Sequence, residues 1–367
     1  MTGILALIVA WLFPLGFLYG VRALDLYRTG KFQYNILSLL WGSAAYGLAV
    51  LLNSLLLQNT EITRDQAIQY AAPVLEELLK AGILFYLVRR PDFNYVVDGA
   101  IYGFGAGMGF AIVENTEYVL GSTGVALVLA LSRVFSTNLI HASGSGLIGT
   151  ALAAARDERR WRGAATAAAG IVIAIALHVG FNSMVNSGWL LVFAIAAGMF
   201  GAALIVTAIR KGLAVQKVWI EEKLGATDRV TRGEAQVVGK LADLDNVLAP
   251  LVERFGAEKA VTVEEFLLLQ AKIGIKRKLH ERSADAERKR EIETEISQLR
   301  SEMELARKKA GTYCMLFVRG IFPEARSPVW GLIQNRIEQA NLGNAGGGLW
   351  DLASSRIKTS ESGGREA

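Results

Sequence analysis

Seven long apolar segments constrain the fold of this chain more than any other feature. Each is long enough to cross a bilayer as a helix, which takes roughly 17 to 25 mostly apolar residues. The chain of 367 residues is 52% hydrophobic, above the usual range for a soluble protein. We therefore predict an all-α, polytopic membrane helix bundle of about seven transmembrane helices. The segments run over about Ile4 to Val21, Ile36 to Leu57, Ala71 to Val88, Tyr95 to Val113, Val125 to Ala155, Ala164 to Val185 and Trp189 to Ile209.

Basic residues in the connecting loops alternate from one side of the predicted bundle to the other. The loops after the first, third, fifth and seventh segments are rich in lysine and arginine, and the others hold one such residue at most. Basic loops face the cytoplasm in membrane proteins. The pattern predicts the amino terminus outside and the carboxy-terminal domain in the cytoplasm. It also agrees with an odd number of spans.

The residues after Arg210 are dense in charge and predict a soluble helical domain. We place the membrane domain at residues 1–210, a cytosolic helical domain at 211–343, and a tail rich in glycine and serine, expected to be disordered, at 344–367. A long helix is expected from about Thr262 to Lys309. Apolar residues recur along it at coiled-coil spacing, which suits an antiparallel helix pair or a homodimer. They are Ile292, Ile296, Leu299, Met303, Ala306 and Ala310.

The positive net charge of the chain does not predict a nucleic-acid partner. Basic residues of the carboxy-terminal domain are interleaved with acidic ones at helical spacing, as on a solvated helix surface. Much of the remaining excess lies in the loops between the apolar segments, where it reports topology. The partners that we expect are the lipid bilayer and other proteins.

Adjacent glutamates inside an apolar helix are the strongest functional signal. An ionised side chain at the centre of a spanning helix costs about 2.5 to 3.5 kcal/mol on insertion scales, so such residues are rare and mark function by default. Glu76 and Glu77 are followed by Lys80, which lies within reach of either carboxylate on one helix. One glutamate is then held ionised by the lysine, and the other is suited to take a proton from water.

Further polar residues lie within the predicted spans. His178 and Asn182 are four residues apart and share a helix face, so both can donate to one oxygen, as in an oxyanion hole. Glu114 and His141 are predicted at a similar depth. Asp98 lies toward the cytoplasmic side, where the start of a helix explains it equally well.

In their order and spacing, these residues resemble the PrsW family of intramembrane proteases, which is related to the CAAX prenyl endopeptidases and the abortive-infection membrane proteins. The matching motifs are Ala72-Pro73-Val74-Leu75-Glu76-Glu77-Leu78-Leu79-Lys80, Asp98-Gly99, Tyr102-Gly103, Gly109-Phe110-Ala111, Glu114-Asn115, His141-Ala142, and His178 with Phe181-Asn182.

The resemblance implies roles for these residues. Glu76 or Glu77 would hold the attacking water with His141, and His178 with Asn182 would hold the oxyanion. Lys80, Asp98, Glu114 and Asn115 would support them. It further implies a bacterial inner-membrane endopeptidase that cleaves a membrane-anchored regulatory protein, such as an anti-sigma factor.

Three functions stay open from the sequence. The first and preferred one is this peptidase, acting without a cofactor. The second is a zinc-dependent peptidase, although the chain has no His-Glu-x-x-His motif. Its ligands would come from Glu76, Glu77, Glu114, His141 and His178. The third is a non-enzymatic transporter or signalling scaffold, in which the buried charges form an ion path.

Overall fold

The computed structural model of the chain describes residues 2–122, 124–156, 158, 160–186, 191–224, 244–283 and 285–320, and these form helices and no strand. The chain divides into two compact units. One comprises Met1–Lys223 with Leu268–Glu302, and the other Leu224–Leu267 with Met303–Ala367. These divisions differ from the predicted domain boundaries, which stay predictions. The tail at 344–367 lies outside the described residues.

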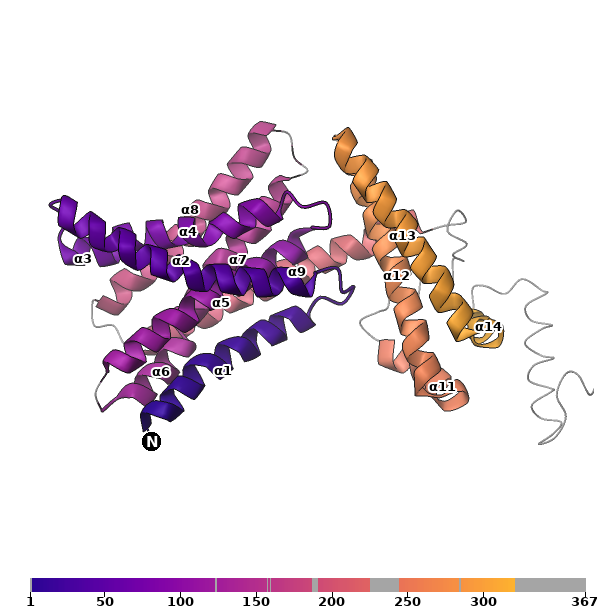
Figure 1. The fold of residues 1–367 in the computed structure, drawn as a ribbon, viewed down its shortest axis with the longest axis horizontal. Helices are drawn as coiled ribbons and strands as arrows, with labels where there is room; N and C mark the ends of the chain where they lie inside the picture. The colour runs from indigo at the N-terminus through magenta and orange to yellow at the C-terminus, as the bar shows by residue number, and fades with distance from the viewer. Residues whose placement is uncertain are drawn as a thin grey trace, which may run out of the picture. The chain divides into compact units, whose positions relative to one another are not determined.

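Six helical segments of the first unit are long and apolar enough to cross a membrane (Figure 1), which supports a multi-pass membrane protein. The fifth apolar segment is interrupted at Phe135 and Ser136, where α6 ends and α7 begins. Which side of the membrane each loop faces stays a prediction. The candidate spanning helices are α1 (Thr2–Ala23), α2 (Phe32–Asn59), α5 (Val96–Gly121), α6 (Ala126–Val134) with α7 (Thr137–Ala155), α8 (Arg160–Asn186) and α9 (Leu191–Lys223).

The third predicted span, Ala71 to Val88, corresponds to the short helix α4 (Ala72–Leu87), which is not among these six candidates. With 16 residues it is about 24 Å long, less than the roughly 30 Å of a bilayer core. It continues, however, from α3 (Arg64–Gln66), which Thr63 caps, through the π-helical turn η1 (Ala67–Ala71). That α4 spans the membrane remains a prediction.

Pro73 explains the π-helical turn ahead of α4. Proline has no backbone N–H, and its ring clashes with the carbonyl four residues earlier, so the preceding turn widens. The Ala72 N–H donates to the Ala67 carbonyl, five residues back. The next bond of that pattern would run from residue 73 to the Ile68 carbonyl, which proline cannot make.

Helix α5 lies at the centre of the bundle and is the most buried of the candidate spans. It packs against α7 and α2 at close range. A side chain at Gly107 would collide with the His141 carbonyl, and one at Gly103 with that of Ser145. The absence of side chains at these glycines brings α7 near enough to α5 for side chains of the two helices to meet.

The prediction of one long helix from Thr262 to Lys309 is wrong. Two helices form over this range, α12 (Ala257–Arg282) and α13 (Ala286–Ala310). Asp285 starts the second, since its Oδ1 accepts from the Glu287 N–H, 2.9 Å away. In the first unit Lys276 pairs with Glu295, and in the second Arg307 lies over the Phe266 ring. The two helices are therefore antiparallel.

The predicted apolar seam lies on α13. Ile292, Ile296, Met303, Ala306 and Ala310 are buried, and Leu299 is half-buried. This fits the antiparallel pair, whereas coiled-coil geometry and a homodimer stay predictions. The second unit also contains α11 (Leu244–Phe255) and α14 (Thr312–Gly320), which meet through the Phe255 and Phe317 rings.

Candidate active site

A cluster of ionisable side chains forms where four helices of the bundle meet. Glu76, Glu77 and Lys80 come from α4, and His141 and His178 from α7 and α8. Glu114 comes from α5. Glu77, Lys80, His141 and His178 are at most 3% exposed. The fold thus gathers the residues that the sequence placed in separate spans.

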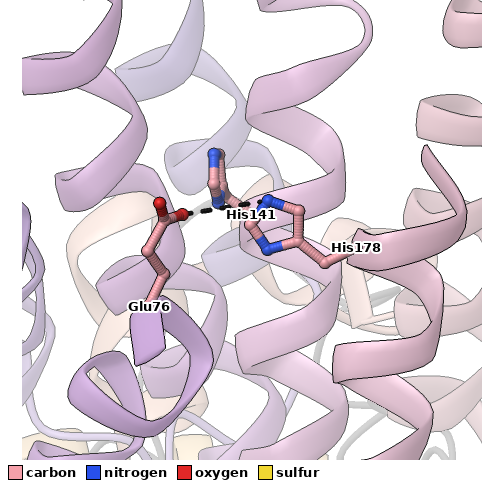
Figure 2. A group of neighbouring side chains, drawn as sticks. All are labelled: Glu76, His141 and His178. Carbon is pink, nitrogen blue, oxygen red and sulfur yellow. Dashed lines mark ion pairs between the residues drawn. The ribbon is translucent and has the colours of Figure 1, made fainter. Parts of the chain in front are cut away.

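Three of these residues present ligand atoms to one another (Figure 2). Atoms of Glu76, His141 and His178 all lie within 4.8 Å of each other. His178 Nε2 is 3.8 Å from Glu76 Oε2. Two imidazole nitrogens and a carboxylate oxygen therefore face a common point.

Glu77 fixes the orientation of the His178 ring. Its Oε1 lies 3.0 Å from Nδ1 of His178 and 2.6 Å from Nζ of Lys80. An ionised carboxylate only accepts hydrogen bonds, so Nδ1 carries the ring proton. The Nε2 lone pair then faces Glu76.

His141 lies between a cation and a carboxylate. Lys80 Nζ is 2.8 Å from Nδ1, and Glu114 Oε2 is 2.9 Å from Nε2. A charged lysine has no lone pair, so without a metal Nδ1 accepts from it and Nε2–H donates to Glu114. To bind a metal ion, His141 would exchange one of these two hydrogen bonds for the ion. The His141 ring also contacts that of His178 edge-on, with centroids 4.7 Å apart.

Arg133 is a member of the site to which the sequence assigned no catalytic role. From the last turn of α6, its Nη2 lies 2.7 Å from Glu114 Oε2, and its Nε donates to Asn115 Oδ1 at 2.6 Å. The guanidinium also covers the Tyr118 ring at 3.8 Å. Its charge inside an apolar segment was the available signal, because such a charge usually has a partner.

Asn182 lies near the cluster but has another partner. Its Nδ2 donates to the Ile68 carbonyl at 2.9 Å. This is the carbonyl that Pro73 leaves without its π-helical bond. Asn182 thus replaces the missing donor and ties α8 to η1, while its oxyanion role stays a prediction.

Asp98 lies apart from the cluster, in the first turn of α5. Its Oδ2 accepts from the Asn94 N–H at 2.8 Å, and its Oδ1 from Thr29 Oγ1 at 2.8 Å. These bonds tie the loop after α1 to the start of α5. These contacts support the alternative that Asp98 has a structural role at the start of a helix.

The fold and the site together define a multi-pass membrane protein with a buried glutamate and histidine centre. Residues 31–209 match the sequence model of the PrsW family intramembrane metalloproteases. This part of the chain matches the family that its motifs predicted. Comparisons with curated proteins and with solved structures give no match.

The family match supports an intramembrane peptidase, which is a hydrolase, and gives no support to the transporter or scaffold alternative. The family is described as metalloproteases, and the arrangement of Glu76, His141 and His178 suits a metal ion. Both findings are compatible with a zinc-dependent peptidase. They do not support a peptidase without a cofactor, which was the preferred prediction from the sequence.

The donor set fits zinc. Two histidines and one glutamate are a ligand set of catalytic zinc sites, and a carboxylate behind a ligand histidine, as Glu77 is behind His178, is the usual supporting contact. Charge points the same way: the cluster has three carboxylates against the two cations Lys80 and Arg133. With neutral histidines, this leaves an excess negative charge that a metal cation would offset.

Proposed function

We propose that the chain is a zinc-dependent intramembrane endopeptidase that hydrolyses a peptide bond of a membrane-anchored protein. The observation that carries the proposal is the convergence of Glu76, His141 and His178 within 4.8 Å in the interior of a membrane helix bundle. Bound there, zinc would polarise the scissile carbonyl and make water more acidic.

The remaining carboxylates have separate tasks in this proposal. Glu77 is fully buried and committed to Lys80 and His178, so it orients a ligand. Glu114 is 15% exposed at the side chain and lies 2.9 Å from His141 Nε2, at the edge of the ligand group. We assign to Glu114 Oε2 the uptake of a proton from the attacking water, with Arg133 holding the carboxylate in place.

The substrate class follows from the setting of the site. A peptide bond reaches a centre inside the bundle most readily if its chain already lies in or beside the membrane. A membrane-anchored protein is therefore the substrate class that we propose. The resemblance to the PrsW family implies a regulatory protein of a bacterial cell membrane, such as an anti-sigma factor.

Co-expression with an epitope-tagged, membrane-anchored anti-sigma factor tests the proposal. Wild-type chain should release a shorter fragment, and Glu76→Gln or His178→Ala should not. Glu158→Gln removes an acid remote from the cluster and should cleave normally. Chelation in purified membranes should stop cleavage, and added zinc should restore it. Undiminished cleavage by the Glu76→Gln variant would refute the assignment.

A further inference from the structure

One candidate span contains the N-terminus of a helix inside the bundle. The span Ala126–Ala155 is interrupted at Phe135 and Ser136, and α7 begins directly after the break. Ser136 is 4% exposed, so the protein encloses this helix end. Non-helical backbone within a membrane is tolerated only where it is buried in protein or lines a polar cavity. The break therefore places a buried helix end in the middle of an apolar segment.

The first backbone N–H groups of α7 have no cap. The N–H groups of the first turn have no partner within any α-helix. Ser136, at the N-cap position, makes no side-chain bond to them, and its hydroxyl donates instead to the Ser132 carbonyl at 2.6 Å. Uncapped N–H groups and the helix dipole together make this end of α7 positive. Such an end favours a negatively charged oxygen.

Asn138 adds a buried carboxamide to the same helix end. It is fully buried, and neither its Oδ1 nor its Nδ2 has a hydrogen-bond partner among the described residues. A buried polar group without a partner is costly, so this carboxamide indicates a ligand or a water that it holds. A helical side chain leans toward the N-terminus of its helix. The carboxamide therefore leans toward the uncapped N–H groups.

This helix end lies beside the catalytic cluster. His141 follows Asn138 by three residues, roughly 4.5 Å along the helix axis, and shares its side of α7. The His141 ring leans back over the turn that contains Asn138. Glu114, to which we assign the proton of the attacking water, lies 2.9 Å from the same ring. A substrate carbonyl bound at the cluster can thus reach the start of α7.

The oxyanion donors predicted from the sequence have other contacts in the structure. Asn182 Nδ2 donates to the Ile68 carbonyl, and Nε2 of His178 faces Glu76 with its lone pair. Neither group presents a free N–H to a substrate. Another donor is therefore needed for the oxygen that becomes negative during hydrolysis.

We propose that Asn138 Nδ2 and the first N–H groups of α7 form the oxyanion hole, an inference that rests on the proposed function. As water adds to the scissile carbonyl carbon, its proton passes to Glu114 and one electron pair of the C=O bond moves to oxygen. Asn138 and the helix end hold this oxygen. The electron pair returns as the C–N bond breaks, and the amine leaves with the proton from Glu114.

Replacement of Asn138 in the full chain tests the proposal, with the tagged anti-sigma factor as substrate. Asn138→Leu should lower kcat about 100-fold, as the loss of an oxyanion donor does, with KM and zinc content unchanged. Its Tm should match or exceed that of the wild type, since an apolar side chain replaces a carboxamide without partners. Asn138→Asp should lower kcat at least as far, because its carboxylate repels the oxyanion.

The matched control is Asn35→Leu. Asn35 is a buried asparagine near the start of α2, also with an Oδ1 that lacks a partner among the described residues, and α2 contributes no residue to the cluster. This variant should keep the wild-type kcat.

Three results would overturn the oxyanion role alone. They are an unchanged kcat in Asn138→Leu, a rise in KM without a fall in kcat, and an equal loss of kcat in Asn35→Leu. A fall in Tm that accompanies the loss of rate in both Asn138→Leu and Asn138→Ala would make Asn138 a structural residue. A wild-type chain that does not cleave would refute the proposed function and this inference together.

Discussion

Glu77 lies behind the ring of His178, with Oε1 3.0 Å from Nδ1. The two residues are 101 positions apart in the sequence, and the contact joins α4 to α8. It determines which nitrogen of His178 is available to a metal. The two adjacent glutamates therefore have different tasks. Glu76 supplies one of the ligand atoms, and Glu77 orients the His178 ring.

Replacement of Glu77 separates its two contributions. Breaking a buried ion pair costs roughly 3 to 5 kcal/mol, so Glu77→Gln should be strongly destabilised by the unpaired Lys80. The double variant with Lys80→Gln should recover stability but still bind zinc about 10- to 100-fold more weakly, because the charge behind His178 is gone. Thermal unfolding and zinc titration check the two effects. Wild-type zinc affinity in the double variant would contradict the supporting role.

Arg133 should act through Glu114. Arg133→Gln is expected to lower cleavage about 10- to 100-fold, the usual effect of removing a group that orients a site residue. Glu114→Gln should lower cleavage further than Arg133→Gln does, to a small residual rate, while zinc stays bound. If the two residues act together, the double variant should be no worse than Glu114→Gln alone. Additive losses in kcat/KM would show that Arg133 serves another purpose.

Asn182 and Pro73 form a testable pair. Asn182→Ala leaves the Ile68 carbonyl without its donor, and the loss of one hydrogen bond at this exposed position should cost about 0.5 to 1.5 kcal/mol. Adding Pro73→Ala returns a backbone N–H that can bond this carbonyl, so the double variant should regain stability and cleavage. Denaturant unfolding and cleavage rates measure both. A variant that is stable but inactive, with no rescue by Pro73→Ala, would favour the oxyanion role over the positioning role.

Asp25, in the loop after α1, should make stability depend on pH. Burial raises the pKa of this carboxyl above its ordinary 3.8, against the opposing hydrogen bond from the Gly30 N–H. The folded state therefore holds the proton more tightly than the unfolded state, and stability falls as pH rises from 3.8 through the raised pKa.

Asp25→Asn keeps an acceptor for the Gly30 N–H and removes the cost of burying an ionised carboxylate. Its Tm should exceed that of the wild type at pH 7, by about 2 to 4 °C for each kcal/mol gained. The gain should vanish below pH 3.8, where the carboxyl is protonated in both states. A gain that is constant over the whole pH range would contradict this account.

Hydropathy and motif spacing predicted much of this protein. Each candidate span coincides with an apolar run, because a helix in lipid must be apolar over its whole length. Glu76, Glu77, His141 and His178 were predicted as one site, since buried charges are costly without partners. The pairing of Glu77 with His178 could not be predicted, because it depends on how separate helices pack.

Two local backbone features also could not be predicted from the sequence, namely the turn between α12 and α13 and the π-helical turn before Pro73. The turn at Ser283 and Asp285 has no glycine or proline within the described residues to mark it, so α12 and α13 were read as one helix. The π-helical turn before Pro73 could be anticipated only as a break. Its partner Asn182 lies more than a hundred residues away.

Zinc content tests the central claim most directly. The chain should be purified without chelator and its zinc measured by mass spectrometry, alongside Glu76→Gln, His178→Ala and the control Glu117→Gln, an acid outside the ligand group. We expect about one zinc per chain in the wild type and the control, and little in the other two. Cleavage by wild-type protein that is free of zinc and of every other transition metal would contradict the account.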